Sequence, residues 1–179
     1  MLLGFSEDLK RENMGRHIAT HGVHYLRKHH LSKMGPILNL EFKTDLNRFK
    51  IADGGDIQAQ FATDAARILQ EKASELFKRK IVPIVFGSCS FQSKLIAFGL
   101  IEAAPMKSGL LIVNVDSHLD LRRPSLNESP DADSRFAFQR VVKSSEFKRV
   151  GGEYRRFGTQ ATCLLGGELK MDSKATEAF

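Results

Sequence analysis

Residues Ile112–Arg122 read IVNVDSHLDLR, a run of β-branched apolar residues that passes directly into a polar segment. Within it, Asp116, His118 and Asp120 follow one another at intervals of two residues. In an extended backbone, side chains at that spacing project to one side. Ligands of parallel sheets bind beyond the carboxyl ends of the strands, so the segment predicts a strand end that presents two carboxylates and an imidazole, where a metal ion could be held.

This set of side chains indicates which metals the strand end could bind. Two carboxylates and one imidazole suit Mn²⁺ or Fe²⁺ better than structural Zn²⁺, which favours thiolate and imidazole ligands. The alternative is an ordinary loop in which the aspartates cap the segment that follows. Spacing alone leaves both interpretations open, although a D-x-H-x-D match seldom falls directly after a buried strand by chance.

Two short runs, Ile81–Phe86 (IVPIVF) and Leu110–Val115 (LLIVNV), are apolar on both faces, as expected for parallel strands that helices cover on each side. Each run is preceded by a stretch with apolar residues at helical spacing. These stretches are Asp64–Lys80, with Thr63 as a candidate N-cap, and Gln92–Ala104. The alternation of strand and helix predicts an α/β fold with a parallel sheet.

Weaker signals mark the remaining segments. Leu2–Phe5 and Phe49–Ile57 are candidate strands. Ser125–Asp133 is rich in Ser, Pro, Asn and Asp, which is typical of a surface loop.

The chain of 179 residues, 42% of them hydrophobic and 27% charged, has the size of one globular domain with one core. It contains no apolar stretch long enough for a membrane span, and its amino terminus becomes polar too early for a signal peptide, so we expect a cytoplasmic protein. The cysteines Cys89 and Cys163 cannot form a disulfide framework, which excludes a disulfide-rich secreted scaffold. Cys89 is a candidate nucleophile at a helix start, but no base is identifiable nearby and a buried thiol is the favoured interpretation.

The net charge of +6 reflects 27 basic and 21 acidic side chains. The basic residues form two loose groups, one before residue 35 and one in the last third of the chain, which includes Arg155 and Arg156. Trp is absent and Tyr occurs twice, which argues against specific nucleic-acid binding, so we interpret both groups as solvated surface.

Five of the six histidines fall between residues 17 and 30, and His17, His21 and His24 could share one helical face. A zinc site is one interpretation of this cluster, but no cysteine or carboxylate lies at ligand spacing. An exposed basic helix face is the favoured alternative.

The segment Asp116–Asp120 (DSHLD) resembles the second metal motif of the arginase-like ureohydrolases, D-A-H-x-D, with Ser117 at the small-residue position. Pro83–Ser93 (PIVFGSCSFQS) is similar to the strand and G-G-S-N-D-Q-S loop of formimidoylglutamase-like members. Further stretches resemble the family's strands and loops over residues 2–163, namely Leu2–Asp8, Gly15–Gly22, Ile51–Gln58 and Tyr154–Cys163.

The resemblance implies a three-layer αβα fold of the arginase/deacetylase-like type, with a mainly parallel sheet that is incomplete. A partial domain would occupy residues 1–165, followed by a polar tail at 166–179. Complete members use a binuclear Mn²⁺ centre to hydrolyse a C–N bond in guanidino or amidino compounds such as formimidoylglutamate, agmatine or arginine. By the same resemblance, Asp116 would bridge the two metals, and His118 and Asp120 would each bind one of them.

Three departures from the family pattern affect this site. Ser90 stands where the family places a histidine ligand, and a hydroxyl is a poorer donor. Ser134 and Arg135 begin the equivalent of the family's S-G-x-P-F substrate loop, with a bulky cation at the glycine position. The family's later D-x-D strand has no counterpart, because Asp131–Asp133 has the spacing but follows a loop-like segment.

These departures set the functional expectation. Two metal ions close together need several bridging carboxylates, so we expect a single, weakly bound Mn²⁺ and impaired or lost hydrolysis, with no catalytic residue assigned. If the chain is active, its partner is a small amidino or guanidino substrate. The alternatives are a non-catalytic protein that pairs with a second copy or with a full-length relative, and a truncated gene product without a function of its own.

Overall fold

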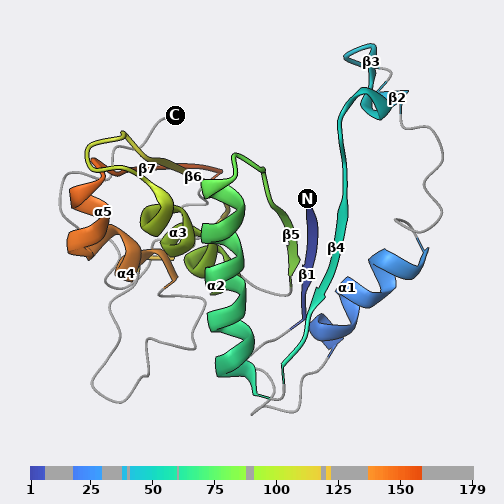
Figure 1. The fold of residues 1–179 in the computed structure, drawn as a ribbon, viewed down its shortest axis with the longest axis horizontal. Helices are drawn as coiled ribbons and strands as arrows, with labels where there is room; N and C mark the ends of the chain where they lie inside the picture. The colour runs from blue at the N-terminus through green and yellow to red at the C-terminus, as the bar shows by residue number, and fades with distance from the viewer. Residues whose placement is uncertain are drawn as a thin grey trace.

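The computed structural model describes residues 1–6, 18–29, 38–39, 41–59, 61–87, 91–117, 120–121 and 137–158. The strands are β1 (Leu2–Phe5), β2 (Leu38–Asn39), β3 (Thr44–Asp45), β4 (Asp53–Ile57), β5 (Ile84–Gly87), β6 (Leu111–Val115) and β7 (Glu153–Phe157). The helices are α1 (Ile18–His29), α2 (Ala62–Lys78), α3 (Phe91–Ala103), α4 (Ala137–Lys143) and α5 (Ser145–Arg149), with a 3-10 turn at Leu46–Arg48. In this part of the chain, β2 and β3 form a small antiparallel pair, and the other strands form two parallel sheets (Figure 1).

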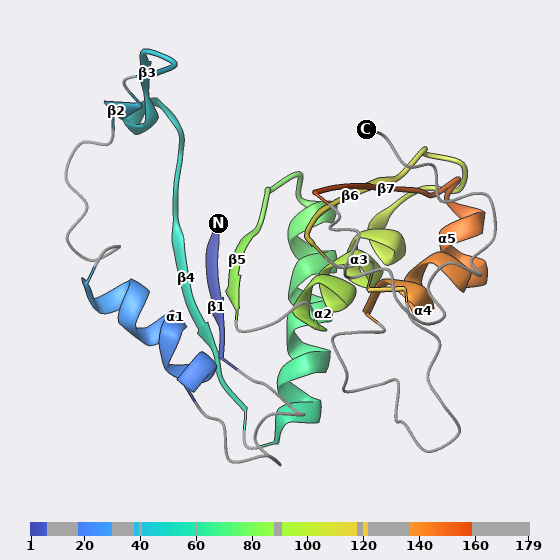
Figure 2. The same cartoon turned by 180° about the vertical axis from the view of Figure 1, so that it is seen from behind.

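The first sheet has the order β4-β1-β5, with β1 in the centre. Strand β1 runs parallel to both neighbours, so that Phe5 lies opposite Ile57 of β4 and Gly87 of β5. Helix α1 lies along one face of this sheet and α2 along the other, as the two opposite views show (Figure 1 and Figure 2). Leu3 and Phe5, two residues apart, share one face of the central strand and are both buried, and Phe5 packs with Ala65 and Leu69 of α2.

An arginine holds α1 on this sheet. Arg27 donates hydrogen bonds of 2.9 Å from Nε and 2.7 Å from Nη2 to Asp56 Oδ1, and its Nη1 donates to both carboxylate oxygens of Asp53. Gly4 of β1 leaves room for this arrangement, because a Cβ there would lie 1.9 Å from Asp56 Oδ1. Arg27, which belongs to the amino-terminal basic group expected to be solvated, instead pairs with two acids of β4.

The exposed side of α1 carries His21, His24 and His29. This agrees with the interpretation of a basic helix face in contact with water. His17 and His30 lie outside the described residues. None of the helices in the described ranges is long and apolar enough to cross a membrane.

Helices α2 and α3 approach each other closely. The inward face of α2 consists of fully buried apolar residues at intervals of three and four, Ala65, Leu69, Ala73 and Leu76. A Cβ on Gly99 of α3 would lie 2.6 Å from the carbonyl oxygen of Gln70 and 2.8 Å from the Cβ of Ala73. The glycine is therefore required by packing, since any other residue would push the two helices apart.

The second sheet consists of β6 and β7 in parallel, in register from Leu111 opposite Glu153 to Val115 opposite Phe157. One face packs on α3, α4 and α5, where Ile112 and Tyr154 meet Ile101, Phe138, Val141, Phe147 and Val150. The other face exposes four apolar side chains, Leu111, Val113, Val115 and Phe157. The sequence-based expectation that Leu110–Val115 is covered on both faces is therefore wrong for β6, because the described helices pack on one side only.

The β4-β1-β5 sheet and the β6–β7 sheet are not hydrogen-bonded to each other in the described part of the chain. Within the described residues no hydrogen-bonded ladder joins β5 to β6, and the buried apolar residues form two clusters, one around Phe5, Leu69 and Leu95 and one around Ile101 and Val141. The expectation of one core is corrected accordingly. Helix α3 contributes to both clusters and so connects them.

Several element boundaries differ from expectation. Helix α2 begins at Ala62, with Phe61 in extended conformation at the N-cap and no side-chain capping bond, so Thr63 is not the cap. Strand β4 begins at Asp53 rather than Phe49, and β5 begins at Ile84 rather than Ile81. Pro83 lacks an N–H for a ladder bond, which explains the late start of β5. The Ser125–Asp133 loop, the two cysteines and residues 159–179 lie outside the described residues.

The contact at Gly99 yields a stability prediction with an internal control. Gly99→Ala should lower the free energy of unfolding by about 1–3 kcal/mol, because the added methyl group overpacks the α2–α3 contact. Gly22→Ala in α1, where no described atom lies within 4 Å of the added Cβ, should raise it by roughly 0.5–1 kcal/mol through helix propensity. Urea unfolding followed by circular dichroism measures both, and equal stabilisation by the two substitutions would contradict the packing argument.

Candidate functional site

The carboxyl end of β6 presents Asp116. Its backbone N–H donates a 3.1 Å hydrogen bond to the carbonyl oxygen of Phe157, which extends the β6–β7 pairing by one residue. The Asp116 side chain is half-buried, and the hydroxyl of Ser117 donates to its Oδ1 at 3.4 Å. The predicted metal ligand thus lies at the strand end, as the spacing of the motif indicated.

Asp120 is held more tightly. The residue is 7% exposed, and its backbone adopts a positive φ of 52°, a conformation that aspartate tolerates better than most residues. Its carbonyl oxygen accepts hydrogen bonds from the N–H groups of Phe138 and Gln139, at 3.1 and 3.3 Å. The first turn of α4 therefore fixes Asp120, and the fully buried Leu121 anchors the next position.

A buried polar cluster lies on the covered face of β6 and β7. Asn114 Nδ2 donates a 3.0 Å hydrogen bond to the hydroxyl of Tyr154. The ring of Tyr154 packs against the ring of Phe138, with the ring centroids 5.2 Å apart. Burial raises the pKa of Tyr154 far above its usual value, while the bond from Asn114 lowers it. The negative charges of Asp120 and Asp116 raise this pKa further and the charge of Arg156 lowers it, so all three groups act on the same hydroxyl.

Arg156 is the unexpected member of this cluster. It is 6% exposed, and its Nε and Nη1 are buried without a hydrogen-bond partner among the described residues. The expectation that the carboxyl-terminal basic group is solvated is therefore wrong for this residue. The sequence Glu153–Phe157 (EYRRF) contained a signal for this burial. In a strand, Tyr154 and Arg156 must share one face and Arg155 must take the other.

Lys94, in the first turns of α3, is a second buried cation that the sequence did not reveal. The residue is 5% exposed, and its Nζ lies 4.4 Å from the centroid of the Phe91 ring. Burial, with a smaller contribution from the charge of Arg140, lowers the pKa of Lys94 to about 8. Lys94 follows residues 88–90, which contain the predicted ligand position Ser90.

The structure brings together only part of the predicted site. Asp116 and Asp120 lie around the same buried cluster, whereas His118, Ser90, Ser134 and Arg135 are outside the described residues. Among the described residues no group of three or more His, Cys, Asp or Glu side chains is arranged to hold a metal ion. Two carboxylates beside a buried guanidinium do not fit a binuclear Mn²⁺ centre, which needs additional anionic ligands to neutralise its charge.

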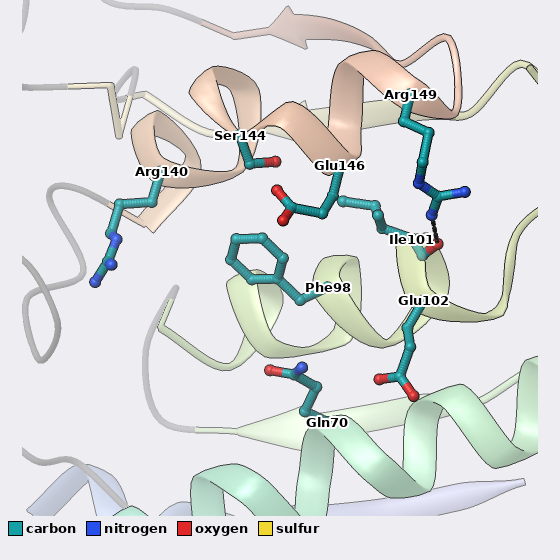
Figure 3. Close-up of a pocket in the computed structure, with 8 residues that line it drawn as sticks. All are labelled: Gln70, Phe98, Ile101, Glu102, Arg140, Ser144, Glu146 and Arg149. Atoms are coloured by element: carbon teal, nitrogen blue, oxygen red, sulfur yellow. Dashed lines mark hydrogen bonds between the residues drawn. The ribbon is translucent and has the colours of Figure 1, made fainter. Parts of the chain in front are cut away.

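A surface hollow of about 510 Å³ lies elsewhere, between α2, α3 and the α4–α5 segment. Figure 3 shows Phe98 between Gln70 and Glu146, with Arg149 at one end, where its Nη2 donates a 3.1 Å hydrogen bond to the carbonyl oxygen of Ile101. None of the predicted site residues lines this hollow. The strand end, and not the hollow, is therefore the candidate site.

The sequence model of the Arginase family matches residues 1–155. The chain is similar to the crystal structure of Trypanosoma cruzi formiminoglutamase with Mn²⁺, at 30% sequence identity and a TM-score of 0.73 over 90% of this chain and 52% of that one. The formimidoylglutamase from Bacillus subtilis shares the fold, at 16% identity and a TM-score of 0.60 over 88% of this chain and 46% of that one. This chain thus spans about half the length of these two structures, and no curated protein sequence matches it.

Burial of Lys94 predicts a pH-dependent stability. The pKa of Lys94 is lower in the folded than in the unfolded chain, so the folded state loses this proton at a lower pH. The free energy of unfolding should therefore rise with pH between about pH 8 and the unfolded pKa of about 10.4. Lys94→Met should abolish that rise and raise the free energy of unfolding at pH 7 by roughly 1–3 kcal/mol. Urea unfolding at several pH values tests this, with Lys72→Met on the surface of α2 as the control. Unchanged pH dependence in Lys94→Met would contradict the assignment.

Proposed function

Since this chain belongs to the arginase family, we propose that it represents about half of a ureohydrolase fold in which hydrolysis is impaired or lost. The complete reaction would cleave a C–N bond in a linear amidino or guanidino compound, formimidoylglutamate in the first instance and agmatine or arginine as relatives. The similarity to formiminoglutamase at 30% identity supports this order of substrates.

The strand end of β6 carries the proposal. It retains Asp116 and Asp120 of the D-S-H-L-D motif, but a buried arginine lies in the same cluster and the described residues supply no third ligand. Ser90 stands where the family places a histidine ligand. Loss of outer support for a metal site alone typically lowers activity or affinity 10–100-fold, and loss of direct ligands has a larger effect. We therefore assign no hydrolytic step to the residues of this chain.

A single Mn²⁺ is the most that we propose for this strand end. Asp116, His118 and Asp120 would hold it weakly, with water in the remaining positions, and only with the imidazole neutral. The crystal structure of the trypanosomal formiminoglutamase with Mn²⁺ supports the choice of metal.

The first functional test is an activity assay on the chain as written. With Mn²⁺ present, release of formamide from formimidoylglutamate, and of urea from agmatine or arginine, should not exceed that of the matched Asp116→Ala variant. The trypanosomal formiminoglutamase serves as the positive control. Turnover above the variant that a chelator abolishes would overturn the proposal of lost activity.

A second candidate function, a non-catalytic pairing module, is favoured by the uncovered face of β6–β7. Leu111, Val113 and Val115 are about half exposed or more, and Phe157 extends the patch onto β7. Glu153 and Arg155, paired at 3.0 Å, add one charge of each sign to the same face. Such a face is self-complementary, so we propose a second copy of this chain as its partner.

Pairing through this face predicts concentration-dependent association. Sedimentation velocity at several concentrations should show a dimer, and Val115→Lys should convert it to monomer because a charge enters the apolar contact. Val82→Lys is the matched control, since Val82 is 73% exposed and Val115 78% exposed but Val82 lies before β5. A stable wild-type monomer at all concentrations, or equal effects of both substitutions, would rule out this interface.

A further inference from the structure

Arg155 and Arg156 are adjacent in β7 but have opposite environments. The side chain of Arg155 is 50% exposed and pairs with Glu153, whereas Arg156 is almost fully buried on the covered face. Two guanidinium nitrogens of Arg156 lack a hydrogen-bond partner among the described residues. A guanidinium keeps its positive charge in proteins, so the fold places a cation in its interior, and two of its nitrogens form no hydrogen bond to a described residue.

The position of this cation relative to the strand-end aspartates follows from the register. Arg156 lies opposite Asn114, two residues before Asp116, and the next residue of β7 accepts the Asp116 N–H. Asp120 is connected to the same cluster through Phe138, whose N–H donates to the Asp120 carbonyl oxygen and whose ring packs on Tyr154. Tyr154 and Arg156 share one face of β7, about 7 Å apart along the strand.

The electrostatic surroundings of Tyr154 agree with this placement. Asp120, Arg156 and Asp116 all act on the pKa of its buried hydroxyl. Asp116 is half-buried and Asp120 is buried, which limits screening by water.

We propose that the guanidinium of Arg156 takes the electrostatic place of a metal ion next to Asp116 and Asp120 and thereby weakens the binding of divalent cations at this strand end. The inference rests on the proposed function only in taking these aspartates as the remnant of a metal site. The fixed positive charge balances the two carboxylates and lets the strand end fold without metal. The same charge repels Mn²⁺.

Arg156 therefore acts as a determinant of metal affinity, and its charge rather than its shape is responsible. Like charges separated by several ångströms in a partly buried site change an affinity by at least about tenfold. A neutral side chain at position 156 removes this repulsion and leaves both aspartates in place.

Isothermal titration calorimetry with Mn²⁺ tests the proposal on the full chain. Arg156→Met should bind Mn²⁺ at least about tenfold more tightly than the wild type, or measurably where the wild type shows no binding. Arg156→Lys keeps the charge and should keep the weak affinity. Arg155→Met, the matched control on the exposed face, should stay within about threefold of the wild type because solvent screens that charge. The double variant Arg156→Met/Asp116→Ala should lose the gain.

Circular dichroism melting accompanies each titration. The melting curves show which variants are folded, and Arg156→Gln replaces Arg156→Met in the titration if the methionine variant does not fold. The proposal is overturned if the neutral variant gains no affinity, if Arg155→Met gains equally, or if the gain survives Asp116→Ala. Failure of the proposed function would be seen in a different experiment, the activity assay, as chelator-sensitive turnover by the wild-type chain.

Discussion

Gly99 lets helix α3 approach α2 so closely that one added carbon would lie 2.6 Å from a backbone oxygen. This contact matters beyond the two helices, because each belongs to a different part of the molecule. Helix α2 covers the β4-β1-β5 sheet, whereas α3 also packs under β6 through Ala97 and Ile101. Since no described strand pairing joins the two sheets, the packing of α2 against α3 is the main connection between the two hydrophobic clusters. A helix in this position must be apolar on several sides, and α3 is.

The backbone holds both described aspartates at the strand end of β6. Asp116 is fixed by strand pairing and Asp120 by the first turn of α4, and both arrangements use backbone hydrogen bonds that do not depend on a metal. Around the buried Tyr154 hydroxyl, the charges of Asp116 and Asp120 raise its pKa and the charge of Arg156 lowers it. The positions of the two aspartates are therefore set by the backbone and by the packing around them.

The exposed apolar face of β6–β7 is unusual for a parallel sheet. Parallel sheets are normally covered on both faces, because their strands are apolar on both sides. In this chain the described helices α3, α4 and α5 all pack on one face of β6–β7, and the structures that it resembles are about twice as long. The apolar residues Val113 and Val115 remain where a covering layer would be expected. Pairing with a second copy is the proposal that follows from this surface.

Sequence patterns within a few residues of each other were enough for the alternation of strands and helices, the inward stripe of α2 and the position of Asp116 after a strand. These features arise from side-chain periodicity along one element, so they can be predicted without knowing what packs against it. The break between the sheets, the pairing of Arg27 with Asp53 and Asp56, and the burial of Lys94 and Arg156 required the folded chain. In EYRRF, alternation places Tyr154 and Arg156 on one face, but only the packing of α4 against that face decides that it is the buried one. Contacts between segments distant in sequence leave no local pattern, and for that reason a charge that looked solvated proved to be internal.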